Sequence, residues 1–305
     1  MAPKRAALLA LAPVVMIGLV LPTATNAQAS TKSECGRVLV KPSAWLGGHG
    51  VAVRKNVRGN NGSCKGRSTK NPAVQNGTGW DCFELPSRLF YVKGWGQIST
   101  GGNGGADNIP EGSPWLDYYP NGSGKLPVPG DLMIERYATH GHVTVVDRVA
   151  DGVIYAVEQN ATDTGRKSYS LMGSAIDGAY NNGIVRGFVH SPQNTSHGPL
   201  GTAAKVRAPK VRGLSVNAGA TSGHISVSWA KVTSKVGVRR VVVQTSKLGS
   251  SGVWGMWRTK AVSRNTAASS FSPKAKAGAS YRVRAKGSSL VGDGAWAISG
   301  VVVAR

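Results

Sequence analysis

Most apolar residues of this chain fall in short runs of strand length that are bounded by turn-forming residues. Between residues 75 and 190 such runs cover 131–135, 142–149, 153–159 and 184–190. The second and third runs are separated only by a turn at Asp151-Gly152, which favours an antiparallel hairpin. This pattern limits the region to antiparallel sheet with little helix.

One segment of this region has a helical pattern instead. Apolar residues recur near helical spacing at Cys82, Leu85, Leu89 and Val92. Gly94 stands where such a helix would end, and Asp81 can cap its first N–H groups. One helix followed by a run of strands predicts an α+β domain over residues 75–190, with a long surface loop across 96–124.

A second set of strand-length runs follows a stretch rich in proline. Residues 191–207 have the composition of a linker. The runs beyond it cover 225–229, 239–245, 281–286 and 296–303, with Gly and Ser turns between them. Residues 208–305 are therefore predicted to form an all-β antiparallel sandwich.

The first 29 residues have the features of a secretory signal peptide. Lys4 and Arg5 precede an apolar run, and small residues at Ala27-Gln28-Ala29 resemble a cleavage site. The alternative is a membrane anchor, but Pro13 and Pro22 interrupt the apolar run, which is short for a bilayer. No later segment is apolar enough to span a membrane, so we expect a secreted, extracellular protein.

Positive charge is concentrated in the C-terminal region. Residues 205–305 hold 18 Lys and Arg against one acidic residue, Asp293, whereas residues 30–204 hold 17 against 13. Such a surface attracts polyanions such as anionic wall polymers, membrane surfaces or extracellular nucleic acid, or it serves only solubility. No nucleic-acid readout motif is present, so we predict no specific nucleic-acid partner.

The three cysteines suggest one disulfide and one free thiol. Cys35 and Cys64 flank a segment rich in Gly, Asn, Lys and Arg that has little capacity to form a core. We predict a Cys35–Cys64 disulfide in a loop-rich extension over residues 30–74. Cys82 is then left as the free thiol, at a predicted helix start, where the helix dipole favours a thiolate.

A cysteine nucleophile needs a base, and the best candidate is His142 at the start of a predicted strand. His140, two residues earlier, is a rival. The hairpin at Asp151-Gly152 brings the end of the following strand back beside His142, so Glu158 or Asn160 is expected to orient the imidazole. The alternative is that each residue is structural: a buried inert cysteine, a strand histidine and a turn asparagine.

The ordered motifs resemble the CHAP family of cysteine- and histidine-dependent amidohydrolases and peptidases, over roughly residues 75–190. The motifs are Trp80-Asp81-Cys82-Phe83-Glu84 with Arg88, Pro129-Gly130-Asp131-Leu132, Gly141-His142-Val143 and Glu158-Gln159-Asn160. The resemblance implies a papain-like (NlpC/P60-like) α+β fold with Cys82 as nucleophile, His142 as base, Glu158 as orienting group and Asn160 as polar support. It also implies amide cleavage in bacterial peptidoglycan, at the muramoyl–L-alanine link or within stem and bridge peptides, and hence association with the cell wall. A smaller branch of the family cleaves glutathionylspermidine-type amides.

The C-terminal region resembles a fibronectin type III domain, an immunoglobulin-like sandwich. The resemblance rests on Ile225-Ser226-Val227-Ser228-Trp229 and Tyr281-Arg282-Val283-Arg284-Ala285, which makes Trp229 and Tyr281 core residues. Trp254 and Trp257 could form an exposed pair for sugar rings, but sandwich packing is the expectation. The sequence thus predicts a secreted peptidoglycan hydrolase without cofactor or metal, and the alternative is a non-catalytic wall- or polyanion-binding protein.

Overall fold

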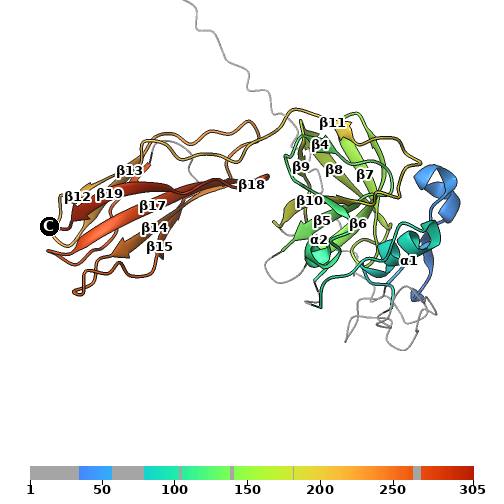
Figure 1. The fold of residues 1–305 in the computed structure, drawn as a ribbon, viewed down its shortest axis with the longest axis horizontal. Coiled ribbons are helices and arrows are strands. Elements are labelled where there is room, and N and C mark those ends of the chain that lie inside the picture. The colour runs from blue at the N-terminus through green and yellow to red at the C-terminus, as the bar shows by residue number, and fades with distance from the viewer. Residues whose placement is uncertain (1–33, 57–78, 103–104, 138–140, 181, 264–268) are drawn as a thin grey trace, which may run out of the picture.

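The computed structural model describes residues 34–56, 79–102, 105–137, 141–180, 182–263 and 269–305 (Figure 1). The predicted signal peptide, Cys64 and the rival base His140 lie outside these residues. Within them, no helix is long and apolar enough to cross a membrane.

The first domain is built on a seven-stranded antiparallel sheet. Its strands in spatial order are β3 (Asp117–Pro120), β10 (Ile184–His190), β5 (Leu132–Arg136), β6 (Gly141–Ala150), β7 (Val153–Val157), β8 (Arg166–Met172) and β9 (Ala175–Asp177). The four predicted strands are present, with ends shifted by at most two residues. The sequence did not reveal β8, because Tyr169 is its only buried residue and the others are polar, exposed or only partly buried.

Helix α1 (Glu84–Lys93) packs on one face of this sheet, as predicted. Gly94 ends it in the left-handed conformation, at φ 67°. The segment expected to be one long loop, 96–124, is partly ordered, which corrects that prediction: it contains a 3₁₀ turn η4 (Ala106–Asn108), a short helix α2 (Ile109–Gly112) and β3. These elements form because Ile109 and Leu116 are buried in the core.

Each face of the sheet has its own hydrophobic core. Leu85, Leu89 and Phe90 of α1 meet Ile134 and Val145 on one face. On the other face a second cluster joins Met133, Val146, Ile154, Ala156, Tyr169, Ile176, Val185 and Phe188. Successive residues of β5 alternate between the two clusters, as expected from the two-residue period of a strand.

The N-terminal extension corrects a second prediction, because it contributes to the core. It contains β1 (Val38–Val40), two 3₁₀ turns η2 (Pro42–Ala44) and η3 (Leu46–Gly48), and β2 (Val53–Arg54). Trp45 and Leu46 are 2% and 0% exposed and belong to the same cluster as α1. The indole N–H of Trp45 donates to the Val51 carbonyl at 2.8 Å, which satisfies its one polar group.

The second domain is a β-sandwich, as predicted. Strands β12 (Ser215–Ala218), β13 (Ile225–Trp229) and β16 (Ser269–Phe271) form one sheet. The other contains β14 (Arg240–Lys247), β15 (Arg258–Ser263), β17 (Ser280–Ser289), β18 (Gly292–Asp293) and β19 (Ala297–Val303). Trp229 and Tyr281 lie in the core between the sheets. Trp254 and Trp257 do not belong to that core cluster, so the expected sandwich packing is wrong for them.

The predicted linker is bound to the first domain along part of its length. Within it, β11 (Gly201–Thr202) pairs with β4 (Lys125–Leu126). Asn121 at the end of β3 then joins both domains: its side-chain amide donates to the carbonyls of Ile176, Val185 and, in the sandwich, Leu290. Asn121 is 7% exposed, so these hydrogen bonds are largely shielded from water.

Candidate active site

Cys82 lies two residues before α1, in a turn that Asp81 stabilises. The Asp81 Oδ1 atom accepts hydrogen bonds from the backbone N–H groups of Phe83 and Glu84, both at 3.0 Å. This is the capping predicted from the sequence, and it leaves the thiol beside the positive end of the helix dipole. The thiol is free and the residue is partly buried.

His142 lies on β6 and contacts both predicted partners. Its Nε2 atom is 3.0 Å from Oε2 of Glu158, and the two side chains are 6% and 0% exposed. A side-chain hydrogen bond also joins His142 to Cys82. With Nε2 held by Glu158, the Nδ1 atom is the one left to face the sulfur. Three predicted residues, Cys82, His142 and Glu158, thus form one chain of hydrogen bonds.

The electrostatics of this chain favour a protonated imidazole. Burial lowers the pKa of His142, but the Cys82 thiolate and the Glu158 carboxylate outweigh it and raise this pKa to about 9. Burial raises the pKa of Glu158, but its hydrogen bonds with His142 and Tyr180 lower it. The net result is a lowered pKa. At neutral pH the imidazole is therefore protonated and lies beside the Glu158 carboxylate.

Tyr180 is a site residue that the sequence did not indicate. Its hydroxyl donates to Oε1 of Glu158 at 2.5 Å, and its ring meets the edge of the His142 imidazole at 5.7 Å between centroids. Both carboxylate oxygens of Glu158 are therefore engaged. Tyr180 lies in the segment before β10, and no pattern in the sequence connects it with β6 or β7.

A buried ion pair between Lys167 and Glu135 lies next to Tyr180. The Lys167 ammonium is 2.5 Å from Oε1 of Glu135 and 3.2 Å from the centroid of the Tyr180 ring. Glu135 also accepts hydrogen bonds from the hydroxyl groups of Tyr137 and Tyr169 and from the backbone N–H of Tyr180. Burial, Glu135 and the Cys82 thiolate raise the pKa of Tyr137, so its hydroxyl stays protonated beside Cys82.

Gln159 links the turn at Cys82 and helix α1 to the end of β7, next to Glu158. Its amide N–H group donates to the Asp81 carbonyl at 3.1 Å and to Oε2 of Glu84 at 2.9 Å. Its carbonyl accepts from the backbone N–H of Arg54 at 2.8 Å. The alternation of side chains along a strand could have revealed this role, because it puts Gln159 on the face opposite Glu158, toward α1. The Glu84–Arg88 ion pair lies in the same network, at 2.7 Å.

Residues 73–160 match the family model of the CHAP domain, a span that ends at Asn160 and contains all four predicted site residues. The chain carries a CHAP domain. This match indicates a hydrolase of the amidase and peptidase class. No curated protein matches the chain.

Several solved structures that resemble the chain are fibronectin type III domains. A fibronectin type III-like protein from Clostridium thermocellum is 19% identical with a TM-score of 0.24, covering 32% of this chain and 94% of its own. A fourth fibronectin type III domain from human is 20% identical with a TM-score of 0.28, covering 37% and 92%. For titin kinase with its flanking domains the identity is 14%, the TM-score 0.26 and the coverage 32% of this chain and 17% of that one.

The remaining predicted residues are Asn160 and the two cysteines of the predicted disulfide, Cys35 and Cys64. Asn160 follows the Glu158-Gln159 pair in the left-handed conformation, at φ 63°, which is typical of a turn asparagine. Glu158, the residue two positions earlier, contacts the imidazole. Cys35 is disulfide-bonded, whereas its predicted partner Cys64 lies outside the described residues. That pairing stays a prediction.

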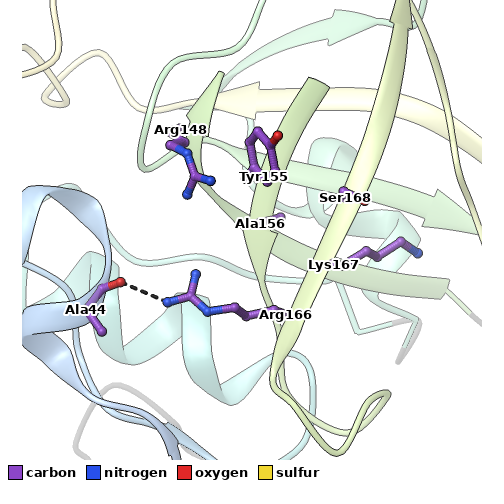
Figure 2. Close-up of a pocket in the computed structure, with 7 residues that line it drawn as sticks. All are labelled: Ala44, Arg148, Tyr155, Ala156, Arg166, Lys167 and Ser168. Atoms are coloured by element: carbon purple, nitrogen blue, oxygen red, sulfur yellow. Dashed lines mark hydrogen bonds between the residues drawn. The ribbon is translucent and has the colours of Figure 1, made fainter. Parts of the chain in front are cut away.

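A hollow of about 460 Å³ lies beside the CHAP core, but it is separate from the Cys82–His142 pair. It is lined by Ala44, Arg148, Tyr155, Ala156, Arg166, Lys167 and Ser168 (Figure 2). Arg148 and Arg166 both bind Asp147, at 3.3 and 3.2 Å, so their charges are partly neutralised. Lys167 points away from both arginines in Figure 2, consistent with its contact to Glu135. Among the described residues, no group of three or more His, Cys, Asp or Glu could hold a metal ion.

Proposed function

We propose that this protein is a secreted peptidoglycan hydrolase that cleaves an amide bond through a cysteine thioester. The bond is either the N-acetylmuramoyl–L-alanine link or one within the stem or bridge peptides. The observation that carries the proposal is the hydrogen-bonded series Cys82–His142–Glu158 inside a CHAP domain. A cysteine at a helix start that faces a strand histidine is also the arrangement expected of a papain-like α+β hydrolase.

The proposed reaction has two steps that use the same pair of residues. The Cys82 thiolate attacks the amide carbonyl carbon, and the tetrahedral intermediate collapses to a thioester as His142 donates its proton to the leaving amine. A water molecule then attacks the thioester while His142 accepts a proton, which releases the carboxylic acid product and the Cys82 thiolate. The His142 pKa of about 9 supports the first step, because the imidazole holds its proton at neutral pH. The backbone N–H of Cys82 at the helix start is the simplest oxyanion donor.

Peptidoglycan digestion by single-residue variants tests this assignment. We expect Cys82→Ala and His142→Ala to abolish release of soluble fragments from purified peptidoglycan, whereas Asp163→Asn, a surface change in the β7–β8 connection, should keep full activity. Mass analysis of the fragments would place the scissile bond. Unchanged turnover in Cys82→Ala would refute the nucleophile. Absence of turnover in the wild type, with retained binding to peptidoglycan, would favour a non-catalytic wall-binding protein.

Secretion is proposed from the first 29 residues alone. We expect export of the full chain with removal of residues 1–29, and retention of a variant that lacks them. The N-terminus of the exported protein, determined by mass spectrometry, checks this directly. An exported protein that still begins at Met1 would contradict the cleavage site, and retention of the full chain would contradict secretion itself.

A further inference from the structure

A row of stacked aromatic rings and cations runs along the outer face of the sandwich, on the sheet that contains β17. The row consists of Trp254, Arg282, Trp257, Arg284, Trp296 and Lys286, and we refer to it as the tryptophan–cation row. The Arg282 guanidinium lies 4.7 Å from the ring centroids of both Trp254 and Trp257. The Arg284 guanidinium lies 4.5 Å from Trp257 and 4.2 Å from Trp296, and the Lys286 ammonium 4.8 Å from Trp296.

The alternation of β17 separates the cations of this row from the hydrophobic core. Val283 and Ala285 are buried between the two sheets, and Arg282, Arg284 and Lys286 occupy the alternate, partly exposed positions. Alternate residues of a strand are about 7 Å apart, so three positive charges repeat at that interval. The rings are supplied from outside β17: Trp254 and Trp257 by the connection between β14 and β15, and Trp296 by the residue before β19.

Ring stacking, and not ion pairing, holds the two arginines. In the part of the chain that the structure describes, the Arg282 Nε atom is buried without a hydrogen-bond partner, and no salt bridge involves Arg282 or Arg284. Arg284 Nε donates to Oε1 of Gln244 at 2.8 Å. Lys286 pairs with Asp293, which is the single acid of residues 205–305. A guanidinium stacked on a ring keeps its in-plane N–H groups directed outward, where they can bind anions.

We propose that the tryptophan–cation row binds an extended phosphodiester polymer of the cell wall, a polyol phosphate. A phosphodiester chain with three-carbon links repeats its charge every six backbone bonds. These six bonds span about 7 Å when extended, because the three backbone bonds of one amino-acid residue span about 3.5 Å. This repeat matches that of the three cations. Each phosphate would accept charge-assisted hydrogen bonds from one guanidinium or ammonium group.

Nucleic acids share this phosphodiester repeat, but they bind single-strand sites by stacking bases on aromatic rings. In this row the Trp257 and Trp296 rings already contact two cations each, which leaves little ring surface for bases. The choice of a wall polymer also rests on the proposed function in peptidoglycan cleavage. The row would hold the catalytic domain near its substrate.

Binding to a defined polymer tests the row independently of catalysis. The full chain with Cys82→Ala would be passed over immobilised poly(glycerol phosphate), and over single-stranded DNA with the same number of phosphates. Arg282→Gln with Arg284→Gln should weaken polymer binding at least tenfold, since two charge-assisted contacts are lost. The matched control, Lys231→Gln with Lys274→Gln, removes the same charge from exposed positions outside the row and should change it less than twofold.

The double variant Arg282→Lys with Arg284→Lys keeps both positive charges but loses the planar set of guanidinium N–H donors. It replaces the glutamine double variant in the assay if that variant does not fold. We expect at least a threefold loss of polymer binding for the lysine double variant, and thermal denaturation would verify the fold of each variant. Equal losses in the row and control variants would overturn the site, and so would a polymer that does not bind. A selective loss of DNA binding in the row variants would assign the row to nucleic acid instead. Peptidoglycan digestion by the wild type, measured separately, keeps the hydrolase proposal distinct from these outcomes.

Discussion

Replacing Glu158 with Gln isolates the charge of the orienting group from its shape. Glu158 is fully buried, and its two oxygens contact Nε2 of His142 at 3.0 Å and the Tyr180 hydroxyl at 2.5 Å. A glutamine can keep both contacts, with its carbonyl facing the imidazolium N–H and its NH₂ group facing the tyrosine oxygen. The substitution therefore removes the negative charge and leaves the hydrogen-bond geometry in place.

The lost attraction sets the size of the effect. Two unit charges about 4 Å apart attract by about 4 kcal/mol at an effective dielectric constant near 20. The amide dipole recovers part of this, so we expect a net loss of about 3 kcal/mol of transition-state stabilisation, or about a hundredfold in kcat/KM. Because Glu158 helps to raise the pKa of His142, the variant should also lose activity at a lower pH than the wild type on the alkaline side.

Peptidoglycan digestion across pH, with thiolate absorbance as a second measurement, would check both effects. The control is Asp163→Asn, which neutralises a carboxylate that is 87% exposed and should leave the rate and the pH profile unchanged. A Glu158→Gln variant within threefold of the wild-type rate, with the same alkaline limb, would show that Glu158 does not act on the imidazole through its charge.

Four further outcomes are expected. Gln159→Leu should destabilise the fold by about 3 kcal/mol in urea denaturation, because it leaves buried polar partners unpaired, and it should lower kcat. Trp45→Ala should cost about 3–5 kcal/mol in the same assay, whereas a peripheral extension would show almost no loss. The raised His142 pKa stabilises the fold fully below its unfolded value near 6.5, and this stability, on the order of 3 kcal/mol, is lost as pH rises through about 9. Thermal denaturation of the wild type and Cys82→Ala across this range should show a smaller alkaline loss in the variant. Deleting Asp147 should abolish activity because it removes the register shift between β6 and β7, whereas Asp147→Asn keeps the extra residue and a side-chain acceptor and should retain most of the activity. Peptidoglycan digestion measures the activity, and circular dichroism checks the fold.

The parts of the site that sequence predicted are those that depend on local rules. Asp81 caps the turn at Cys82 because an aspartate before a helix accepts backbone N–H groups in any protein. The hairpin at Asp151-Gly152 returns the end of β7 toward the start of β6, where His142 lies, because a two-residue turn pairs the flanking strands antiparallel. These relations involve neighbours in sequence or across one turn, so composition and spacing suffice to find them.

The parts that sequence missed depend on contacts across long separations. Trp45 lies in a segment rich in Gly and polar residues, and only its packing in the cluster that also contains residues of α1 makes it a core residue. Tyr180 reaches Glu158 from the connection between β9 and β10, which has no strand pattern. Trp254 and Trp257 are large apolar residues of the type expected in a core. Their stacking on arginines of β17 follows from the sheet register and not from the residues next to them in the sequence.

The registration of β6 with β7 explains how the hairpin places a carboxylate on the correct face. A regular ladder from the turn at Asp151-Gly152 would set Glu158 level with Val145, whose side chain faces the α1 core and not the imidazole. A bulge at Asp147 shifts the register by one residue, so that Val145 pairs with Val157. Continued by one residue, this register sets Glu158 level with Thr144, on the same face as His142. Asp147 is itself held by the Leu46 N–H at 2.7 Å and by Arg166 at 3.2 Å. The N-terminal extension and β8 therefore stabilise the one irregularity that lets Glu158 meet His142, and this makes residues far from the thiol part of the catalytic geometry.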